Sequence, residues 1–499
     1  MKSKYKKIVE FIKKHDNIFA VMLIFLSIFG ITINVGVTNA DELWNFQNIY
    51  KMYNGFQIYK DANVIDTPLF FWIGELLFKV LGANFLVFRI YNIIIMLILY
   101  FVTYLLLKKL GISKKISIIV ILILITLDNY GMLLVQANYN TMALMLCITG
   151  VLLNINKCRY NTFIQGLILF LIFSTKQNIG VFYGIGLLAC EILNNNCLKY
   201  KIKNLLAEFL TFLILLISLL IYFYINNNLY NFINYTVLGI REFANENIFV
   251  DFSNIILAIF FVLFNIILTT IFIKNKKIDI NKIEEEKLII LNCFSLPLTL
   301  IMIPIANRAH FLIGIHLSLI LFIYLINIMI KRMEFKKSRK AINIILVIFA
   351  ICTCTNSIVN FTFWTNSINN KNYQFNMEDP FYGGIFKEET VKNIENIVEY
   401  IENENENDNI IVLSSKAAFY MIPTHRSNGM MDLPFKGNLG KEGEQGLIEK
   451  IKDMDNVKIL IEKDENSINW QESKEAREYI IENMEKIGEI EEFFIYKEK

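Results

Sequence analysis

Long apolar stretches alternate with short charged loops along most of the chain. The stretches at 18–37, 85–107 and 205–225 are almost free of charge. Each approaches the roughly 20 residues that a helix needs to cross about 30 Å of hydrocarbon. Further candidates lie at 116–127, 142–155, 163–173, 179–193, 255–273, 288–305, 311–330 and 341–363. The pattern predicts an all-α polytopic membrane protein with about 11 transmembrane helices.

The basic residues fall on alternate loops, which predicts an orientation. Basic loops are retained on the cytoplasmic side, and the alternate loops that would face inward hold roughly 26 of the Lys and Arg residues. The outward segments before the tail hold only about six. We therefore expect a multi-pass protein of the cell membrane, with a cytoplasmic N-terminus and an extracytoplasmic C-terminal domain.

The hydrophobic pattern changes in the tail, which is charged and poor in long apolar runs. Helical spacing at 389–402, 443–454 and 472–487 alternates with strand-like runs at 409–413, 457–461 and 493–496. This alternation predicts a small α/β domain. The expected organisation is a transmembrane core at 1–363 with an outer loop at 38–84, a linker at 364–387, and the extracytoplasmic domain at 388–499. Because the tail lacks a Gly-rich phosphate loop and a catalytic triad pattern, we interpret it as a cap that shapes substrate or binds a partner.

The composition is that of a membrane protein, and the placement of the charged residues limits the kinds of partner that we expect. Apolar residues make up 55% of the chain and charged residues 19%, whereas about a quarter of a soluble domain is charged. The lysine runs occupy the short inward loops, so they are topology signals and no nucleic-acid partner is expected. The seven cysteines show neither a disulfide framework nor a zinc-ligand spacing.

An acidic pair follows the first apolar stretch, within the run Asn39-Ala40-Asp41-Glu42-Leu43-Trp44-Asn45. This is a place where a membrane enzyme would hold a catalytic carboxylate at the outer edge of the bilayer. A structural interpretation competes with it, because Asn39 followed by Glu42 is also a helix-capping pattern and acids in a first turn favour the helix dipole.

Several motifs in the first two thirds of the chain resemble those of the type C membrane glycosyltransferases, in the bacterial branch related to protein mannosyltransferases and aminoarabinose transferases. They occur in the same order and on the same side of the membrane as in that family. The matching runs are Asp41-Glu42, Gly55-Phe56-Gln57-Ile58-Tyr59-Lys60-Asp61, Thr67-Pro68-Leu69-Phe70-Phe71-Trp72, Leu81-Gly82, Phe88-Arg89, Ser174-Thr175-Lys176-Gln177 and Asn307-Arg308-Ala309-His310.

The resemblance implies transfer of a sugar from a polyprenyl-phosphate donor to an acceptor of the cell envelope, a glycan, lipid or protein, with inversion at the anomeric carbon. Such a transfer needs a base for the acceptor proton and cations for the departing phosphate. Asp41 would be the base. The cations would be Lys176, Arg241 and Arg308, and the residues implied in substrate binding are Glu42, Tyr59, Asp61, Asn140 and His310.

Some of these residues also have a purely structural interpretation. Lys176 and Arg308 are also suited to anchoring the ends of spans among lipid headgroups. His310 fits an interfacial histidine as well as a participant in the reaction. We expect no metal and no cofactor, because the first outer loop lacks an Asp-x-Asp pair and Asn138-Tyr139-Asn140 stands where the family often has an acid.

Two other functional classes remain open at this stage. A lipid or solute transporter or flippase would bury ionisable residues near the bilayer midplane or break paired spans with Gly and Pro, and the chain has few of either. A non-catalytic membrane subunit that displays the tail domain would make Asp41, Lys176 and Arg308 dispensable.

Overall fold

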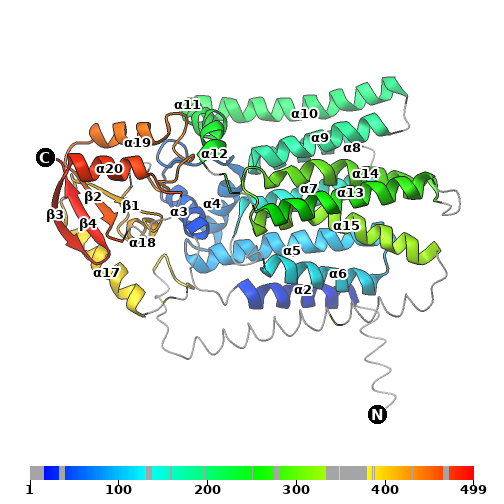
Figure 1. Cartoon of the computed structure of the whole chain (residues 1–499), viewed down its shortest axis with the longest axis horizontal. Helices are drawn as coiled ribbons and strands as arrows, with labels where there is room; N and C mark the ends of the chain where they lie inside the picture. The colour runs from blue at the N-terminus through cyan, green and yellow to red at the C-terminus, as the bar shows by residue number, and fades with distance from the viewer. Residues whose placement is uncertain are drawn as a thin grey trace, which may run out of the picture.

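The computed structural model describes most of the chain and forms a helical bundle with a small domain at one end (Figure 1). The residues that it describes are 16–32, 40–130, 137–157, 160–194, 197–246, 248–249, 251–274, 280–332, 348, 379–384, 386, 388–428, 431–464 and 471–499.

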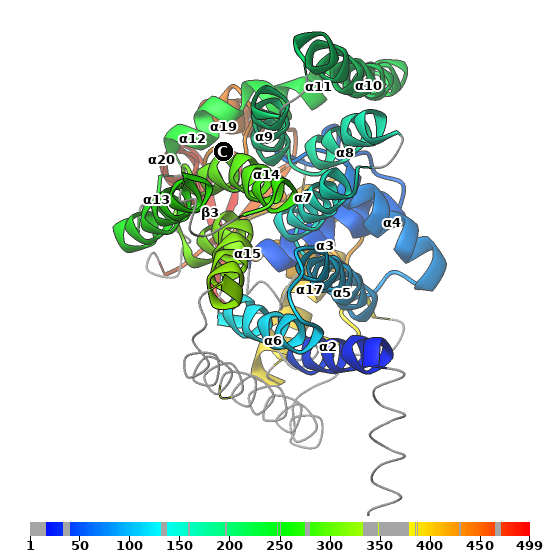
Figure 2. The same ribbon diagram turned by 90° about the vertical axis from the view of Figure 1, so that its right-hand side faces the viewer.

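Five helices of the bundle are long and apolar enough to cross a membrane. They have 18 to 28 residues, and the longest, α10, buries few side chains and exposes Leu, Ile and Phe along its length, as a lipid-facing helix does. Figure 2 shows α10 at the edge of the bundle, with α8 and α9 next to it. The five are α5 (Phe85–Lys109), α7 (Tyr139–Asn156), α10 (Leu198–Ile225), α13 (Phe252–Lys274) and α15 (Arg308–Arg332).

The expected number of about 11 spans is not supported. Within the described residues, the other apolar helices have 15 to 17 residues, fewer than the roughly 20 that a full crossing needs. In α14 the charged first turn and Pro297 near the end shorten the apolar part, and η2 (Thr299–Met302) follows as a 3₁₀ turn. The expected span at 341–363 lies outside the described residues, apart from residue 348. The shorter helices are α2 (Asp16–Thr32), α6 (Lys114–Tyr130), α8 (Asn161–Thr175), α9 (Gln177–Leu193) and α14 (Lys282–Leu298).

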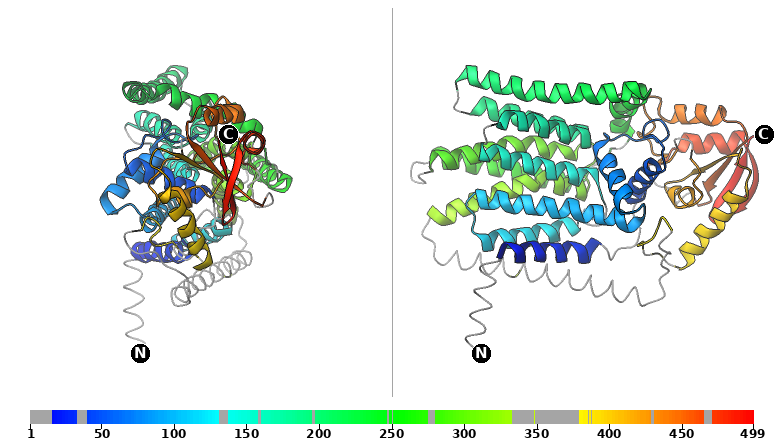
Figure 3. Two further views of the ribbon diagram at one scale, coloured as in Figure 1. Left: turned by 90° about the vertical axis from the view of Figure 1, so that its left-hand side faces the viewer. Right: turned by 180° about the vertical axis from the view of Figure 1, so that it is seen from behind.

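The loop between α2 and α5 forms two helices, α3 (Ala40–Tyr53) and α4 (Leu69–Leu81), as its apolar spacing predicts. Pro68 stands directly before α4, where the missing N–H costs nothing. The helix α3 does not lie on the surface, because every residue from Glu42 to Met52 is buried. Figure 3 shows the reason, since α3 lies between the bundle and the C-terminal domain and is covered on both sides.

The second outer segment is a chain of short helical turns: α11 (Leu229–Ile233), the π-helix η1 (Asn234–Leu238) and α12 (Ile240–Glu246). It lies at the same end of the bundle as α3 and α4 (Figure 1). The two outer segments therefore meet the C-terminal domain together.

The C-terminal domain is the expected α/β unit. Its four strands are β1 (Asn409–Leu413), β2 (Val457–Glu462), β3 (Glu485–Ile490) and β4 (Phe493–Lys497), in the order β1-β2-β4-β3. Strands β1 and β2 are parallel, and the pairs β2/β4 and β3/β4 are antiparallel. Its helices are α17 (Glu388–Asn403), α18 (Ala418–Met421), α19 (Gly443–Lys452) and α20 (Lys474–Asn483).

Alternation along β1 builds a core on each face of this sheet. Ile411 packs in the cluster that holds α19 and α20, whereas Ile410 packs in the cluster that holds α17, because successive strand residues point to opposite faces. The sequence prediction of a helix to residue 487 is wrong at its end. Residues 485–490 form the mostly exposed edge strand β3, whose charged sequence resembles a helix surface until β4 supplies its hydrogen bonds.

Part of the expected linker is docked rather than extended. The described stretch 379–384 accepts two hydrogen bonds from the start of α5, Phe85 N to Pro380 O at 2.8 Å and Leu86 N to Tyr382 O at 2.8 Å. Phe381 is fully buried, with its ring centre 5.9 Å from that of Phe46. The C-terminal domain is therefore joined to the bundle by packing as well as by the chain.

Candidate active site

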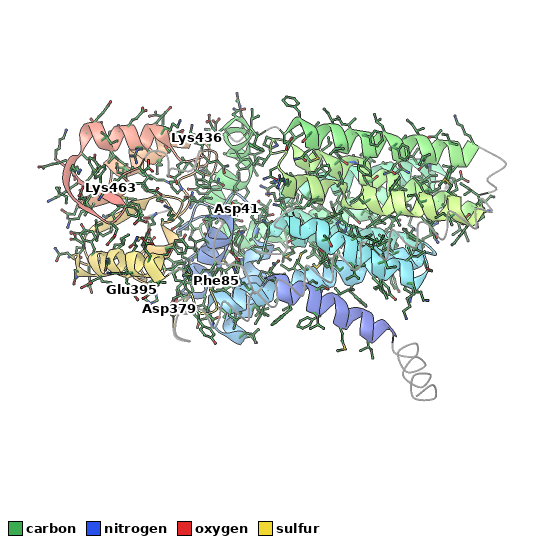
Figure 4. All side chains as sticks on the ribbon, turned by 60° about the horizontal axis from the view of Figure 1, so that its bottom comes forward. Asp41, Phe85, Asp379, Glu395, Lys436 and Lys463 are labelled. Carbon is green, nitrogen blue, oxygen red and sulfur yellow. The ribbon has the colours of Figure 1, made fainter. Side chains whose placement is uncertain are left out.

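A cavity of about 540 Å³ lies where the outer segments, the ends of α7, α9 and α15 and the C-terminal domain meet. Its polar side chains come from segments that are far apart in the sequence. Figure 4 shows Asp41 at this junction, between the bundle and the C-terminal domain. The polar residues that line it on the bundle side are Asp41, Asp66, Asn138, Tyr139, Asn140, Lys176, Gln177, Asn178, Asn307 and His310.

The two acids of the first motif have opposite surroundings. Both stand in the first turn of α3, and neighbouring helical residues point about 100° apart. Asp41 lines the cavity and its side chain is accessible there, although protein encloses it on all sides. Glu42 points away from the cavity and is 0% exposed. Only Asp41 is therefore placed to meet a bound molecule.

Glu42 is held by a buried ion pair with Arg89 of α5. The Nε atom of Arg89 lies 3.2 Å from Oε1 of Glu42, and the guanidinium also lies 4.8 Å from the centre of the Phe85 ring. Both charged groups are removed from water, so each depends on the other for compensation. This pair ties α3 to α5, which is a structural role rather than the expected contact with substrate.

Asp66 is the second acid of the cavity, and sequence reasoning missed it. Its Oδ1 atom lies 2.9 Å from Nζ of Lys176, and Lys176 also lies 4.1 Å from the centre of the Tyr139 ring. Asp66 stands just before Thr67-Pro68 at the start of α4. This repeats the placement of Asp41 at the start of α3, and that repetition is the signal that could have revealed it.

Lys176 is fixed by its place in the chain. It is the single residue between α8 and α9, with extended backbone, so its side chain leaves the bundle at a break between two helices. Two hydrogen bonds pin the Asp66 loop to this break: Thr67 Oγ1 donates to Phe173 O at 2.6 Å, and Gln177 Nε2 donates to Ile65 O at 3.0 Å. The expected cation therefore lies beside the acids of the first outer loop.

The charges in the cavity act on one another. Burial raises the pKa of Asp41, the Lys176 ammonium lowers it, and the Asp66 carboxylate raises it again. Burial likewise raises the pKa of Asp66, and Lys176 opposes that rise. A carboxylate whose pKa is raised is a better proton acceptor, provided that it stays ionised at the working pH.

Two of the other expected substrate-binding residues line the cavity. Asn140 stands in the first turn of α7, where Asn138 caps the helix by accepting from the Asn140 N–H at 2.6 Å. His310 stands in the first turn of α15, with Nδ1 2.8 Å from Oδ1 of Asn307. Both side chains are thus at the helix ends that open on the cavity.

Besides Glu42, four expected site residues lie outside the lining of the cavity. Tyr59 is fully buried, and its hydroxyl donates to the backbone oxygen of Asp66 at 2.7 Å. It therefore holds the backbone of a cavity residue without lining the cavity. Asp61 closes a turn by accepting from Gln57 N at 2.7 Å. Arg241 is exposed on α12, and Arg308 begins α15 between two residues that do line the cavity.

A second cavity of about 520 Å³ lies among α8, α9 and α10, and its lining is almost wholly apolar. Gly180, Gly184, Phe173 and Phe212 form part of its wall. Phe173 and Gly180 are only three and four residues from Lys176 in the sequence. Residues close to Lys176 in the sequence therefore line the apolar cavity, and Lys176 itself lines the polar cavity.

Among the described residues, no group of three or more His, Cys, Asp and Glu side chains could hold a metal ion. The Asp66 carboxylate next to Asp41 already has the Lys176 ammonium as its counter-charge. Comparison with protein families and with curated proteins finds no match for this chain.

Proposed function

We propose that the chain is a membrane glycosyltransferase of type C, which transfers a sugar from a polyprenyl-phosphate donor to an acceptor at the outer face of the cell membrane. The observation that carries the proposal is the single cavity holding Asp41, Asp66 and Lys176 at one end of an apolar helical bundle. A base and a cation for phosphate are the two groups that this reaction needs. The motif resemblance supports the same conclusion.

In the proposed reaction, an acceptor hydroxyl attacks the anomeric carbon and its proton passes to the Asp41 carboxylate. The new bond joins the acceptor oxygen to the anomeric carbon, and the bond between that carbon and the phosphate oxygen breaks. The polyprenyl phosphate leaves with the bonding electron pair, and the ammonium of Lys176 stabilises the added charge. Attack from the side opposite the phosphate inverts the anomeric centre.

The apolar cavity beside Lys176 supports a donor with a lipid chain. A polyprenyl chain would lie among Leu, Val and Phe side chains of α8, α9 and α10, while its phosphate reaches Lys176 at the break between the helices. A free sugar nucleotide would leave this apolar cavity empty, so the lipid-linked donor fits the site better.

A transfer assay tests the proposal directly. The purified chain in lipid nanodiscs is supplied with radiolabelled polyprenyl-phosphate sugars extracted from source-cell membranes, and with envelope glycan from a strain that lacks the protein. We expect labelled glycan and free polyprenyl phosphate, and neither product with Asp41→Asn. If the donor instead crosses the bilayer of sealed vesicles and stays intact, the chain is a transporter and the proposal is wrong.

We also propose that the two outer segments and the C-terminal domain lie outside the cell. With all seven native cysteines replaced, single cysteines at Asn54, Asn245 and Glu449 should react with an impermeant maleimide in intact cells, since all three positions are exposed. A cysteine at Asn281, which is exposed at the other end of the bundle, should react only after permeabilisation. Labelling of Asn281 in intact cells would reverse the orientation.

The transfer rate should rise as pH rises through the pKa of Asp41, because a general base must be ionised. Lys176→Met removes a group that lowers this pKa, whereas Asp66→Asn removes one that raises it. The acid limb of kcat/KM should therefore move to higher pH in Lys176→Met and to lower pH in Asp66→Asn. Profiles of the residual activity that shift in the same direction would assign this limb to another group.

A further inference from the structure

The C-terminal domain supplies one wall of the polar cavity. Leu433, Phe435 and Asn438 come from the segment 431–440, and Gln471 comes from the stretch before α20. These residues lie 120 or more positions from Ile313, the last bundle residue that lines the cavity, so no pattern in the bundle sequence points to them. Because four of its residues line the cavity, the C-terminal domain is part of the site itself.

Backbone pairing holds this wall in shape. Lys436 N donates to Gln471 O at 2.7 Å, and Ser473 N donates to Pro434 O at 3.1 Å. Phe435 and Glu472 form an isolated antiparallel bridge between the two stretches. The two stretches that carry the lining residues are therefore one unit.

The first outer segment fixes the wall to the catalytic side. Asn63 donates through Nδ2 to Leu433 O at 2.7 Å and to Asn438 O at 3.3 Å, and its Oδ1 accepts from Leu433 N at 3.3 Å. Lys51 of α3 forms a buried ion pair with Asp432 at 2.6 Å. The loop that holds Asp66 and the helix that holds Asp41 thus both bind the same segment of the domain.

The second outer segment packs on the same wall. Asn234 Oδ1 accepts from Lys441 N at 3.0 Å. Gly440 has a φ of +80° and lies so close to Asn234 that a Cβ atom would come within 2.7 Å of its amide nitrogen. A glycine is needed there on both grounds. The wall is therefore enclosed by the bundle segments on both sides.

The chemistry of the two sides of the cavity differs. The bundle side carries two carboxylates and an ammonium, whereas the described residues that the C-terminal domain contributes are two apolar side chains and two amides. Amides can donate to and accept from hydroxyl groups, and an aromatic ring offers a face to apolar C–H groups. A charged acceptor group would meet no counter-charge among the described residues that line this wall, and would lose its hydration there.

From this division we infer that Leu433, Phe435, Asn438 and Gln471 form the acceptor subsite, and that the acceptor is an uncharged glycan that presents hydroxyl groups. The inference rests on the proposed glycosyltransferase function and adds the chemical class of the acceptor. The donor binds the charged bundle side, and the acceptor is held between Asp41 and the C-terminal domain. Phe435 packs against a sugar face, and Asn438 binds its hydroxyl groups.

The test uses the full chain in nanodiscs, the labelled polyprenyl-phosphate sugars and the unmodified envelope glycan described above. Asn438→Ala removes the amide without changing the backbone contacts of residue 438, and should raise the KM for the glycan about two- to tenfold, the loss that one hydrogen bond gives. Phe435→Leu should raise the same KM. The KM for the donor should change less than the KM for the glycan in both.

Lys441→Gln is the matched control, because its side chain is exposed on the same segment and does not line the cavity. It should behave as wild type. Asn438→Asp places a carboxylate in the wall and should raise the KM for a neutral glycan further than Asn438→Ala does. If Asn438→Asp lowers the acceptor KM, the acceptor is cationic and the inference is wrong.

The outcomes separate this inference from the proposed function. If Asn438→Ala and Phe435→Leu change the donor KM or the release of sugar to water but leave the acceptor KM as in wild type, the wall belongs to the donor side. That result would refute the acceptor subsite but would not contradict the proposed glycosyltransferase function. If wild-type protein neither transfers nor releases the sugar, the function itself is refuted.

Discussion

Asp41→Asn is expected to lower the transfer rate by about a hundredfold to ten-thousandfold, the usual cost of losing a general base. The substitution keeps the size of the side chain and removes its ability to take the acceptor proton. The measurement is kcat with purified protein in nanodiscs, with donor binding determined in parallel. Donor affinity should change little, because the proposed phosphate ligand is Lys176 rather than Asp41.

Asp61→Asn is the matched control for this loss. Asp61 stands in the same outer loop but serves a turn and does not line the cavity, and an asparagine oxygen can still accept from Gln57 N. Its activity should remain close to wild type. If Asp41→Asn keeps near-normal turnover while Asp66→Asn abolishes it, the base is Asp66.

Glu42→Ala should destabilise the fold by about 3–5 kcal/mol, because it removes the carboxylate that pairs with the buried Arg89 guanidinium. The loss is measured as a lower Tm and a smaller yield of folded protein in detergent. Turnover per folded molecule should fall far less than in Asp41→Asn. Asp41 would then be shown to control turnover, and Glu42 to control the stability of the fold.

Two variants check the cause of that destabilisation. Glu75→Ala breaks the more exposed pair with Lys79 on α4 and should cost only about 0–1 kcal/mol. The double variant Glu42→Leu with Arg89→Met replaces both buried charges by apolar groups and should recover much of the lost stability. A double variant no more stable than Glu42→Ala would show that packing, rather than the unpaired charge, is responsible.

The sequence located part of the site for a physical reason. Asp41, Asn140, Lys176 and His310 each stand at a helix end that follows or precedes an apolar run, so the hydrophobic pattern alone places them near one edge of the bundle. All four line the same cavity. Arg241 and Arg308 satisfy the same pattern but do not line it, because the pattern fixes depth in the bundle and not the direction of a side chain.

Glu42 and Asp66 show what the pattern could not separate. Adjacent acids in one helical turn are equivalent in sequence, and only the presence of Arg89 behind α3 made Glu42 structural. Asp66 was hidden in a loop, where no periodicity ranks one residue above another. The Lys176 ammonium, 110 residues away in the sequence, made Asp66 part of the site.

The sequence by itself determined the class of architecture: apolar helices, a first outer loop with two helices, and a C-terminal α/β domain. These follow from local hydrophobic periods, which a single segment carries. Only the tertiary structure decided which helices are long enough to cross a membrane, which acid faces the cavity, and that Asn63 and Lys51 bind the domain so that it closes the site. Those outcomes depend on contacts between segments that are distant in the sequence, and no local pattern encodes them.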